Sequence, residues 1–170
     1  MIIAEIEPVN GREKTMKGNV KILETLNDLL ADELSAINQY MVHSEMCEDW
    51  GYGRLHEAIE SRAIQEMKHA ESLIGRIIFL EGKPVVSNLK TISIGAEVES
   101  QHKNDLAAET DAVKAYNEGI RLAVEVGDNG TRELLESILK EEEDHVDWLE
   151  TQLDQISQMG VQNYLIEQID

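Results

Sequence analysis

The stretch IQEMKHAE, residues 64–71, decides the fold of this chain. It lies in a run from 53 to 81 whose apolar residues recur at spacings of three and four, which predicts a helix with one apolar face. Glu66 and His69 fall on that face, one helical turn apart. A buried carboxylate is costly without a positive partner, and Arg62 is the only basic residue near this face. A metal ion is therefore the candidate partner, because Glu-x-x-His on a helix is a ligand pair.

The same pattern occurs a second time in KEEEDH, residues 140–145, where Glu142 and His145 lie on another apolar stripe. Single acids, Glu33 and Glu109, interrupt the apolar stripes of two further runs. Each single acid precedes the glutamate of its Glu-x-x-His pair by 33 residues. The chain is therefore two copies of one unit, and a bundle of the four helices would point four glutamates and two histidines at one place.

The composition favours an all-α protein. The chain has 170 residues, enough for one compact domain, with only 4% aromatic residues and two prolines. Its formal net charge of −19 disfavours nucleic acid as a partner and favours cations. The simpler explanation of this charge is that it keeps the protein in solution, and this accounts for most of the surface acids.

Three features predict a cytoplasmic location. The single cysteine, Cys47, excludes an intrachain disulfide and fits a reducing compartment. The segment MIIAEIEPVN, residues 1–10, has no basic start and carries two glutamates, unlike a secretory signal. No apolar run approaches the roughly 20 residues that a membrane helix needs, so we expect no membrane contact.

The pattern along the chain predicts four long helices in two hairpins. We expect an irregular N-terminal extension over 1–18 and one helical domain over 19–170. Turns at 50–53 and 127–130 make each pair antiparallel, whereas the connection over 83–96 is partly extended and long enough to cross the bundle. The expected helices run over about 19–49, 53–81 and 97–126, then from the second turn to about 159, with a short fifth helix over 161–169.

Two divalent ions at the centre would balance the charge of four buried carboxylates while both histidines stay neutral. Mixed carboxylate and imidazole ligation suits iron or manganese better than a closed structural zinc site. The single acids and the histidines would be terminal ligands, and the glutamate of each pair would bridge. Any one of these residues alone would be read as a satisfied core histidine or a solvated acid, as we read Glu141 and Glu143. The six candidate ligands are Glu33, Glu66, His69, Glu109, Glu142 and His145.

From Met16 onward the chain resembles bacterioferritin, the haem-containing ferritin of bacteria. The resemblance implies a ferritin-like four-helix bundle with a long crossover and a short C-terminal helix. It also implies that the six candidates are ferroxidase ligands for two irons per subunit, with Fe(II) and dioxygen or hydrogen peroxide as substrates. The family implication extends to a shell of 24 subunits that stores a ferric mineral. The segments that carry the resemblance are LADELSAINQY (30–40), QEMKHAE (65–71), LEGKP (80–84), NDLAAE (104–109), LKEEEDHVDWLE (139–150) and QMGVQNYL (158–165).

The resemblance gives Met67 a role as well, although a methionine there is otherwise adaptable packing at a subunit contact. In bacterioferritins this methionine is an axial ligand of haem b, shared between two subunits that each give one sulfur. Such a haem suits electron transfer from a ferredoxin-type reductant. Tyr40 matches the tyrosine near the diiron site. Two departures stand out: residues 1–15 precede the usual family start, and Ser61 and Gln65 replace a His and an Asp of an inner-surface iron site.

Two other functions remain open from the sequence. A diiron peroxidase of the rubrerythrin type would use the same ligands, although the chain has no Cys-rich rubredoxin module. A non-catalytic, haem-linked helical scaffold is disfavoured, because a plain bundle would place leucine at positions 33 and 109. We also expect the short C-terminal helix to pack against other subunits through Tyr164, Leu165 and Ile169.

Overall fold

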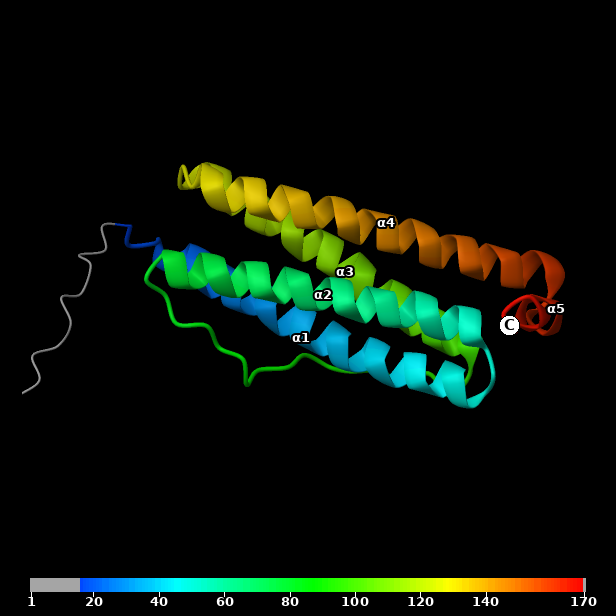
Figure 1. Ribbon diagram of the computed structural model, residues 1–170. Coiled ribbons are helices and arrows are strands. Elements are labelled where there is room, and N and C mark those ends of the chain that lie inside the picture. Colours follow the sequence, from blue (N-terminus) through cyan, green and yellow to red (C-terminus); the bar gives the residue numbers. More distant parts are fainter. Residues whose placement is uncertain (1–15, 170) are drawn as a thin grey trace, which may run out of the picture.

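The structure is a computed structural model that describes residues 16–169, and it is all-helical over that part of the chain. The predicted fold class is confirmed: four long helices form a bundle and a short fifth helix follows (Figure 1). The expected extension over 1–18 falls mostly outside the described residues and stays a prediction. The helices are α1 (Val20–Asp49), α2 (Gly53–Phe79), α3 (Val98–Glu125), α4 (Asn129–Met159) and α5 (Val161–Ile166).

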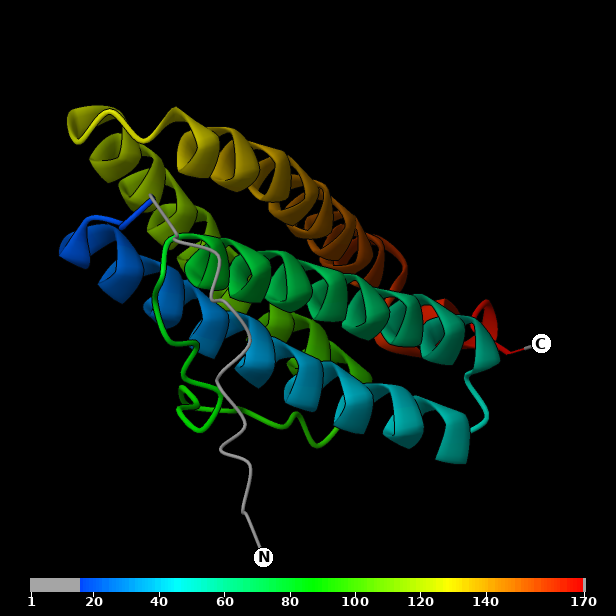
Figure 2. The same cartoon turned by 60° about the vertical axis from the view of Figure 1, so that its left-hand side comes forward.

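The helices form two antiparallel hairpins, α1 with α2 and α3 with α4, and α1 packs against α3 to join them. The crossover between α2 and α3 runs along the outside of α1 from one end of the bundle to the other (Figures 1 and 2). It contains no strand in the part that the structure describes, so the partly extended segment expected over 83–96 pairs with nothing. Side chains of α1 hold it instead: Asn27 accepts from the backbone N–H of Val85, and Gln39 accepts from that of Ser93.

Local sequence explains where the hairpins begin and turn. Asn19, the predicted N-cap of α1, accepts a hydrogen bond from the backbone N–H of Lys21 at 2.9 Å. Asp128 caps α4 in the same way, through the N–H of Thr131 at 3.0 Å. Gly51 and Gly127 have φ angles of 81° and 74° in the two turns. Only glycine adopts this backbone conformation without strain, so both short turns depend on it.

The core consists of two apolar clusters, one toward each end of the bundle. The first contains Leu26 and Leu30 of α1 and Leu73 of α2, and the second contains Tyr40 and Leu55. The candidate ligands lie between them: on α1, Glu33 follows Leu30, the last fully buried residue of the first cluster, and precedes Tyr40 of the second. The helices therefore place the candidate ligands at mid-bundle, where apolar packing above and below limits access of water.

The C-terminal helix differs from the prediction in length and in packing. It ends at Ile166, and Tyr164 is completely buried within its own chain. The Tyr164 hydroxyl donates to Gln152 Oε1 at 2.9 Å and lies 3.1 Å from His102 Nε2. The prediction that Tyr164 packs against another subunit is therefore wrong. Its hydroxyl contacts polar side chains of α3 and α4 within its own chain, at the end of the bundle. Ile169 is 53% exposed.

Candidate metal centre

The structure brings all six candidate ligands together at mid-bundle, and every one of them is buried. They form two groups of four whose potential ligand atoms lie within 4.8 Å of one another. Both groups share Glu66 and Glu142, the acids predicted to bridge. The first group adds Glu33 and His69, and the second adds Glu109 and His145. This overlap is the arrangement that two neighbouring ions with shared carboxylates require.

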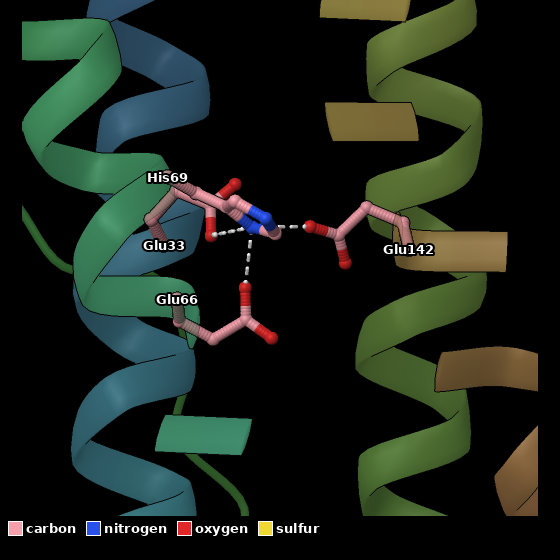
Figure 3. A group of neighbouring side chains, drawn as sticks. All are labelled: Glu33, Glu66, His69 and Glu142. Carbon is pink, nitrogen blue, oxygen red and sulfur yellow. Dashed lines mark hydrogen bonds and ion pairs between the residues drawn. The ribbon is translucent and has the colours of Figure 1, made fainter. Parts of the chain in front are cut away.

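His69 faces the first group with its Nδ1 atom (Figure 3). That atom lies 2.9 Å from Glu66 Oε2, 2.9 Å from Glu142 Oε1 and 3.7 Å from Glu33 Oε2. The carboxylates come from three different helices, α2, α4 and α1, and converge on one nitrogen. His69 and Glu66 are three residues apart on α2, so the sequence spacing alone sets their mutual geometry.

His145 repeats this geometry in the second group. Its Nδ1 lies 3.0 Å from Glu66 Oε1, 3.5 Å from Glu109 Oε1 and 3.6 Å from Glu142 Oε2. Each shared glutamate therefore offers one oxygen to His69 and the other to His145. The two imidazole rings lie 6.3 Å apart between centroids, with an angle of 29° between their planes.

Burial and mutual contact shift the pKa of every group in this cluster. Burial raises the pKa of Glu109 to about 7 and that of Glu33 well above its ordinary value. Burial acts in the same direction on Glu66, but hydrogen bonds from His145 and His69 outweigh it and lower the Glu66 pKa. Burial also opposes the charge on His145, yet its contacts with carboxylates raise that pKa to about 11. Without metal, protons on the histidines supply the positive charge that the acids need.

The donor set fits divalent cations. Glu66 Oε1, Glu142 Oε1 and His145 Nδ1 are buried and make no well-directed hydrogen bond within the described residues, although the two carboxylate oxygens lie 3.0 Å and 2.9 Å from imidazole nitrogens. Arg62, the basic residue that the sequence places near this face, does not pair with these acids among the contacts of the described residues; its guanidinium lies over the Trp148 ring, 4.6 Å from the centroid. Buried polar atoms without a well-directed hydrogen bond are rare in native proteins and indicate a place where a water or an ion binds. Four acids and two imidazoles suit iron or manganese.

Two tyrosines bind the terminal acids in a crosswise arrangement. Tyr40, the tyrosine predicted near the site, donates from its hydroxyl to Glu109 Oε1. Tyr116 donates in the same way to Glu33 Oε1, and both tyrosines are completely buried. The sequence analysis did not single out Tyr116. A usable signal was present, because Tyr116 follows Glu109 by seven residues, the same spacing by which Tyr40 follows Glu33.

Two further polar residues approach the histidines from outside. Glu141 Oε2 lies 3.1 Å from His69 Nε2, and Gln65 Oε1 lies 3.1 Å from His145 Nε2. Glu141 is half exposed, as its interpretation as a solvated acid expects, but its contact with His69 is not part of that interpretation. Glu143 is exposed, as that interpretation expects. Neither contact follows from helical periodicity, because both residues sit beside the apolar stripe and not on it.

A cavity of about 370 Å³ reaches the site from the side of the bundle that faces the crossover. Its wall includes four of the six candidate ligands, and farther out Asp32, Asp111 and Lys90. Burial raises the pKa of Asp32 to about 6, although Lys90 opposes this shift. The cavity gives small polar species a path to the carboxylates, with acids along the way.

Met67 points elsewhere, to the outer surface of α2, and is 52% exposed. Ile64 and Met41, on α2 and α1, are 45% and 54% exposed. Thus the thioether named as a haem ligand from the resemblance is separate from the six buried residues. Of the helices that the structure describes, none is long and apolar enough to cross a membrane.

Comparison with known proteins places this geometry in a family. The ferritin-like domain matches residues 23–159. The chain is 42% identical to bacterioferritin of Brucella melitensis biotype 1 over 149 residues, which cover 88% of this chain and 92% of that protein. The chain belongs to the bacterioferritin family. It is also 41% identical to bacterioferritin of Rhodobacter capsulatus over 151 residues, or 89% of this chain and 94% of the relative.

A third relative, bacterioferritin of Mycolicibacterium paratuberculosis, is 39% identical over 149 residues, which cover 88% of this chain and 94% of that protein. The matches extend across the whole bundle, so the family assignment covers all four long helices. Relatives of this kind favour the bacterioferritin interpretation over the rubrerythrin-type peroxidase and the non-catalytic scaffold.

Proposed function

We propose that this protein stores iron, and that it oxidises Fe(II) to Fe(III) at the buried centre before storage. Membership of the bacterioferritin family supports the storage role. The observation that carries the ferroxidase proposal is the pair of overlapping groups that share Glu66 and Glu142. Two shared carboxylates hold two ions close enough to deliver two electrons to one oxidant molecule.

Charge balance makes the centre suitable for two ferrous ions. Four ionised carboxylates offset the four positive charges of two Fe(II), while both histidines bind as neutral imidazoles through Nδ1. Loss of one electron from each ion adds two positive charges, which hard oxygen ligands stabilise better than imidazole or sulfur. The carboxylate-rich donor set therefore favours the ferric product, which is the direction of a ferroxidase reaction.

The oxidant takes up the two electrons that the two Fe(II) lose. With hydrogen peroxide, two electrons and two protons cleave the O–O bond and yield two waters. With dioxygen, two electrons and two protons yield hydrogen peroxide. The cavity beside the crossover supports access for either oxidant and for Fe(II), because it reaches the carboxylates from outside the bundle.

The proposal includes a shell of 24 subunits with a haem b between paired subunits. Met67 fits an axial ligand, because its thioether is half exposed beside exposed apolar side chains. A haem held by two such sulfurs would supply electron transfer, and a ferredoxin-type protein would be its reductant. We place this assembly in the cytoplasm, as the sequence predicts.

Removing one terminal ligand tests the ferroxidase proposal. We expect Glu33→Ala and His145→Ala each to slow ferrous oxidation by at least about 100-fold, because even indirect partners of a metal ligand contribute 10–100-fold. Stopped-flow absorbance of the ferric product measures the rate, and size-exclusion chromatography checks that assembly is intact. Glu143→Ala removes an exposed acid on the same helix and should oxidise iron at the wild-type rate. Wild-type rates in both ligand variants would defeat the assignment.

A further inference from the structure

A hydrogen-bonded bridge links the outer nitrogens of the two histidines. Each histidine turns Nδ1 toward the acids, which leaves Nε2 facing away from the centre. His145 Nε2 meets Gln65 Oε1 and His69 Nε2 meets Glu141 Oε2, both at 3.1 Å. The amide nitrogen of Gln65 donates to the same oxygen of Glu141, which closes the bridge.

The donors and acceptors of this bridge fit together in only one way. Glu141 can only accept while ionised, so both the Gln65 amide and His69 Nε2 must donate to it. With its nitrogen committed to Glu141, Gln65 presents its oxygen to His145, which must donate from Nε2 as well. Both neutral histidines are thereby held in the Nε2–H tautomer, and each keeps a lone pair on Nδ1 for a metal. The hydrogen bond on the second nitrogen is what sets the metal-binding nitrogen of a histidine.

The bridge is not symmetric in charge. Gln65 precedes Glu66 and Glu141 precedes Glu142, so the two occupy equivalent positions of the repeated unit. One is a neutral amide and the other a carboxylate. A carboxylate behind a metal-bound histidine raises the basicity of the ligand, and a neutral amide does so less. The surroundings of the two terminal acids do not differ in this way, because each acid accepts a hydrogen bond from one buried tyrosine hydroxyl.

We propose that Gln65 and Glu141 are positioning residues whose unequal charge makes the two metal positions unequal. The position of Glu33 and His69, backed by Glu141, takes up the first divalent ion. The position of Glu109 and His145, backed by Gln65, fills second. This inference rests on the proposed dinuclear centre and adds an order of loading to it.

Cobalt(II) alone tests the order without any oxidation. Crystals of the metal-free assembled protein are soaked with one Co(II) per subunit, and anomalous scattering gives the occupancy at each position. We expect higher occupancy beside His69 than beside His145. Calorimetric titration of the same protein in solution should then resolve two binding steps, the first of them tighter.

The variant Glu141→Gln keeps the shape and the accepting oxygen but removes the charge. We expect the first binding step to weaken by about tenfold, the lower end of the usual effect of such partners, because Glu141 is half exposed to water. The two occupancies should become similar. Glu143→Gln is the matched control, because it removes one negative charge two residues further along α4, where the side chain is exposed, and both steps should stay unchanged.

Each outcome bears on a different claim. Equal occupancies in the wild type, or a Glu141→Gln titration identical to the wild type, would overturn the inference and leave the metal centre intact. An equal weakening by Glu143→Gln would overturn it too, because bulk charge would then explain the effect. Absence of cobalt from both positions would overturn the proposed centre and the inference together.

Discussion

The two hairpins, α1 with α2 and α3 with α4, carry the same residues on their inner faces at a constant offset of 76 positions. This offset takes Glu33 to Glu109 and His69 to His145, and it also takes Tyr40 to Tyr116. Even the two turn glycines with positive φ obey it. The inner faces of the two hairpins thus carry the same arrangement of residues. The hairpins also contact each other at this layer, because each tyrosine donates a hydrogen bond to the acid of the opposite hairpin.

The outer faces of the same hairpins differ. Met67 of α2 corresponds to Glu143 of α4, and Ile64 corresponds to Lys140. Thus α2 exposes apolar side chains where α4 exposes charged ones. Exposed apolar groups that cluster on one face of a bundle mark an interaction site, whereas a charged face stays in water. We infer from this difference that the outer face of the first hairpin is the better candidate of the two for contact with a partner or with the proposed haem.

The strongest change that we expect comes from replacing Met67 on the outer face of the first hairpin. We expect Met67→Leu to yield assembled protein without haem, because leucine fills a similar volume but has no sulfur to bind iron. The absorption spectrum of the purified protein measures haem against protein. Met159→Leu, at the end of α4, replaces another half-exposed methionine and should keep haem at the wild-type level. Normal haem in the Met67 variant would assign that side chain to packing alone.

The inner faces of the two hairpins differ in the pKa of their terminal acids, Glu33 and Glu109, and this difference should appear in the protons released when metal binds. Burial raises the pKa of Glu33 well above its ordinary range but that of Glu109 only to about 7. Contacts with carboxylates outweigh burial and keep His69 and His145 protonated without metal. Binding of two divalent ions must displace these protons. We expect about one proton fewer to be released above about pH 8 than below about pH 6, since Glu109 has then already lost its own.

The sign of the effect follows directly: protons compete with the ions, so metal affinity rises with pH and rises more steeply on the acid side. Calorimetry with Zn(II) in buffers of different ionisation enthalpy counts the protons. Glu143→Gln changes the charge nearby without touching a ligand and should give the same counts. A release that stays constant from about pH 6 to about pH 8 would contradict the assignment of this step to Glu109.

The inner faces were predictable from the sequence because acids interrupt an apolar period there. Glu33 and Glu66 stand where leucine would pack, and this conflict can be read without a structure. The sequence predicted less well wherever a contact depends on distance between helices. Glu141 lies off the stripe of α4, yet the approach of α2 brings His69 to it. The prediction for Tyr164 was wrong for a related reason: His102, one of its two polar partners, lies 62 residues away in the chain, on α3.

The weakest change that we expect comes from variants that test whether Tyr40 and Tyr116 are equivalent. Tyr40→Phe and Tyr116→Phe each remove a tyrosine hydroxyl and with it one hydrogen bond to a terminal acid. Without metal and below about pH 6, burial favours the protonated form of both acids, so each loss should cost about 1 kcal/mol of unfolding free energy, the usual value for a neutral hydrogen bond. With Zn(II) bound the acids are ionised, and hydrogen bonds to charged groups contribute about 1.5–3 kcal/mol.

Chemical denaturation of each variant, with and without Zn(II), measures both values, and Tyr164→Phe is the control. The Tyr164 hydroxyl is equally buried but bonds to Gln152 and His102, away from the six ligands, so its loss should cost about 1 kcal/mol whether or not metal is present. If the halves are equivalent, the two site tyrosines respond to metal alike and the control does not respond. A response by Tyr40→Phe alone would mean that Glu33 does not depend on its tyrosine, and that the repeat preserves residues at this layer without preserving their roles.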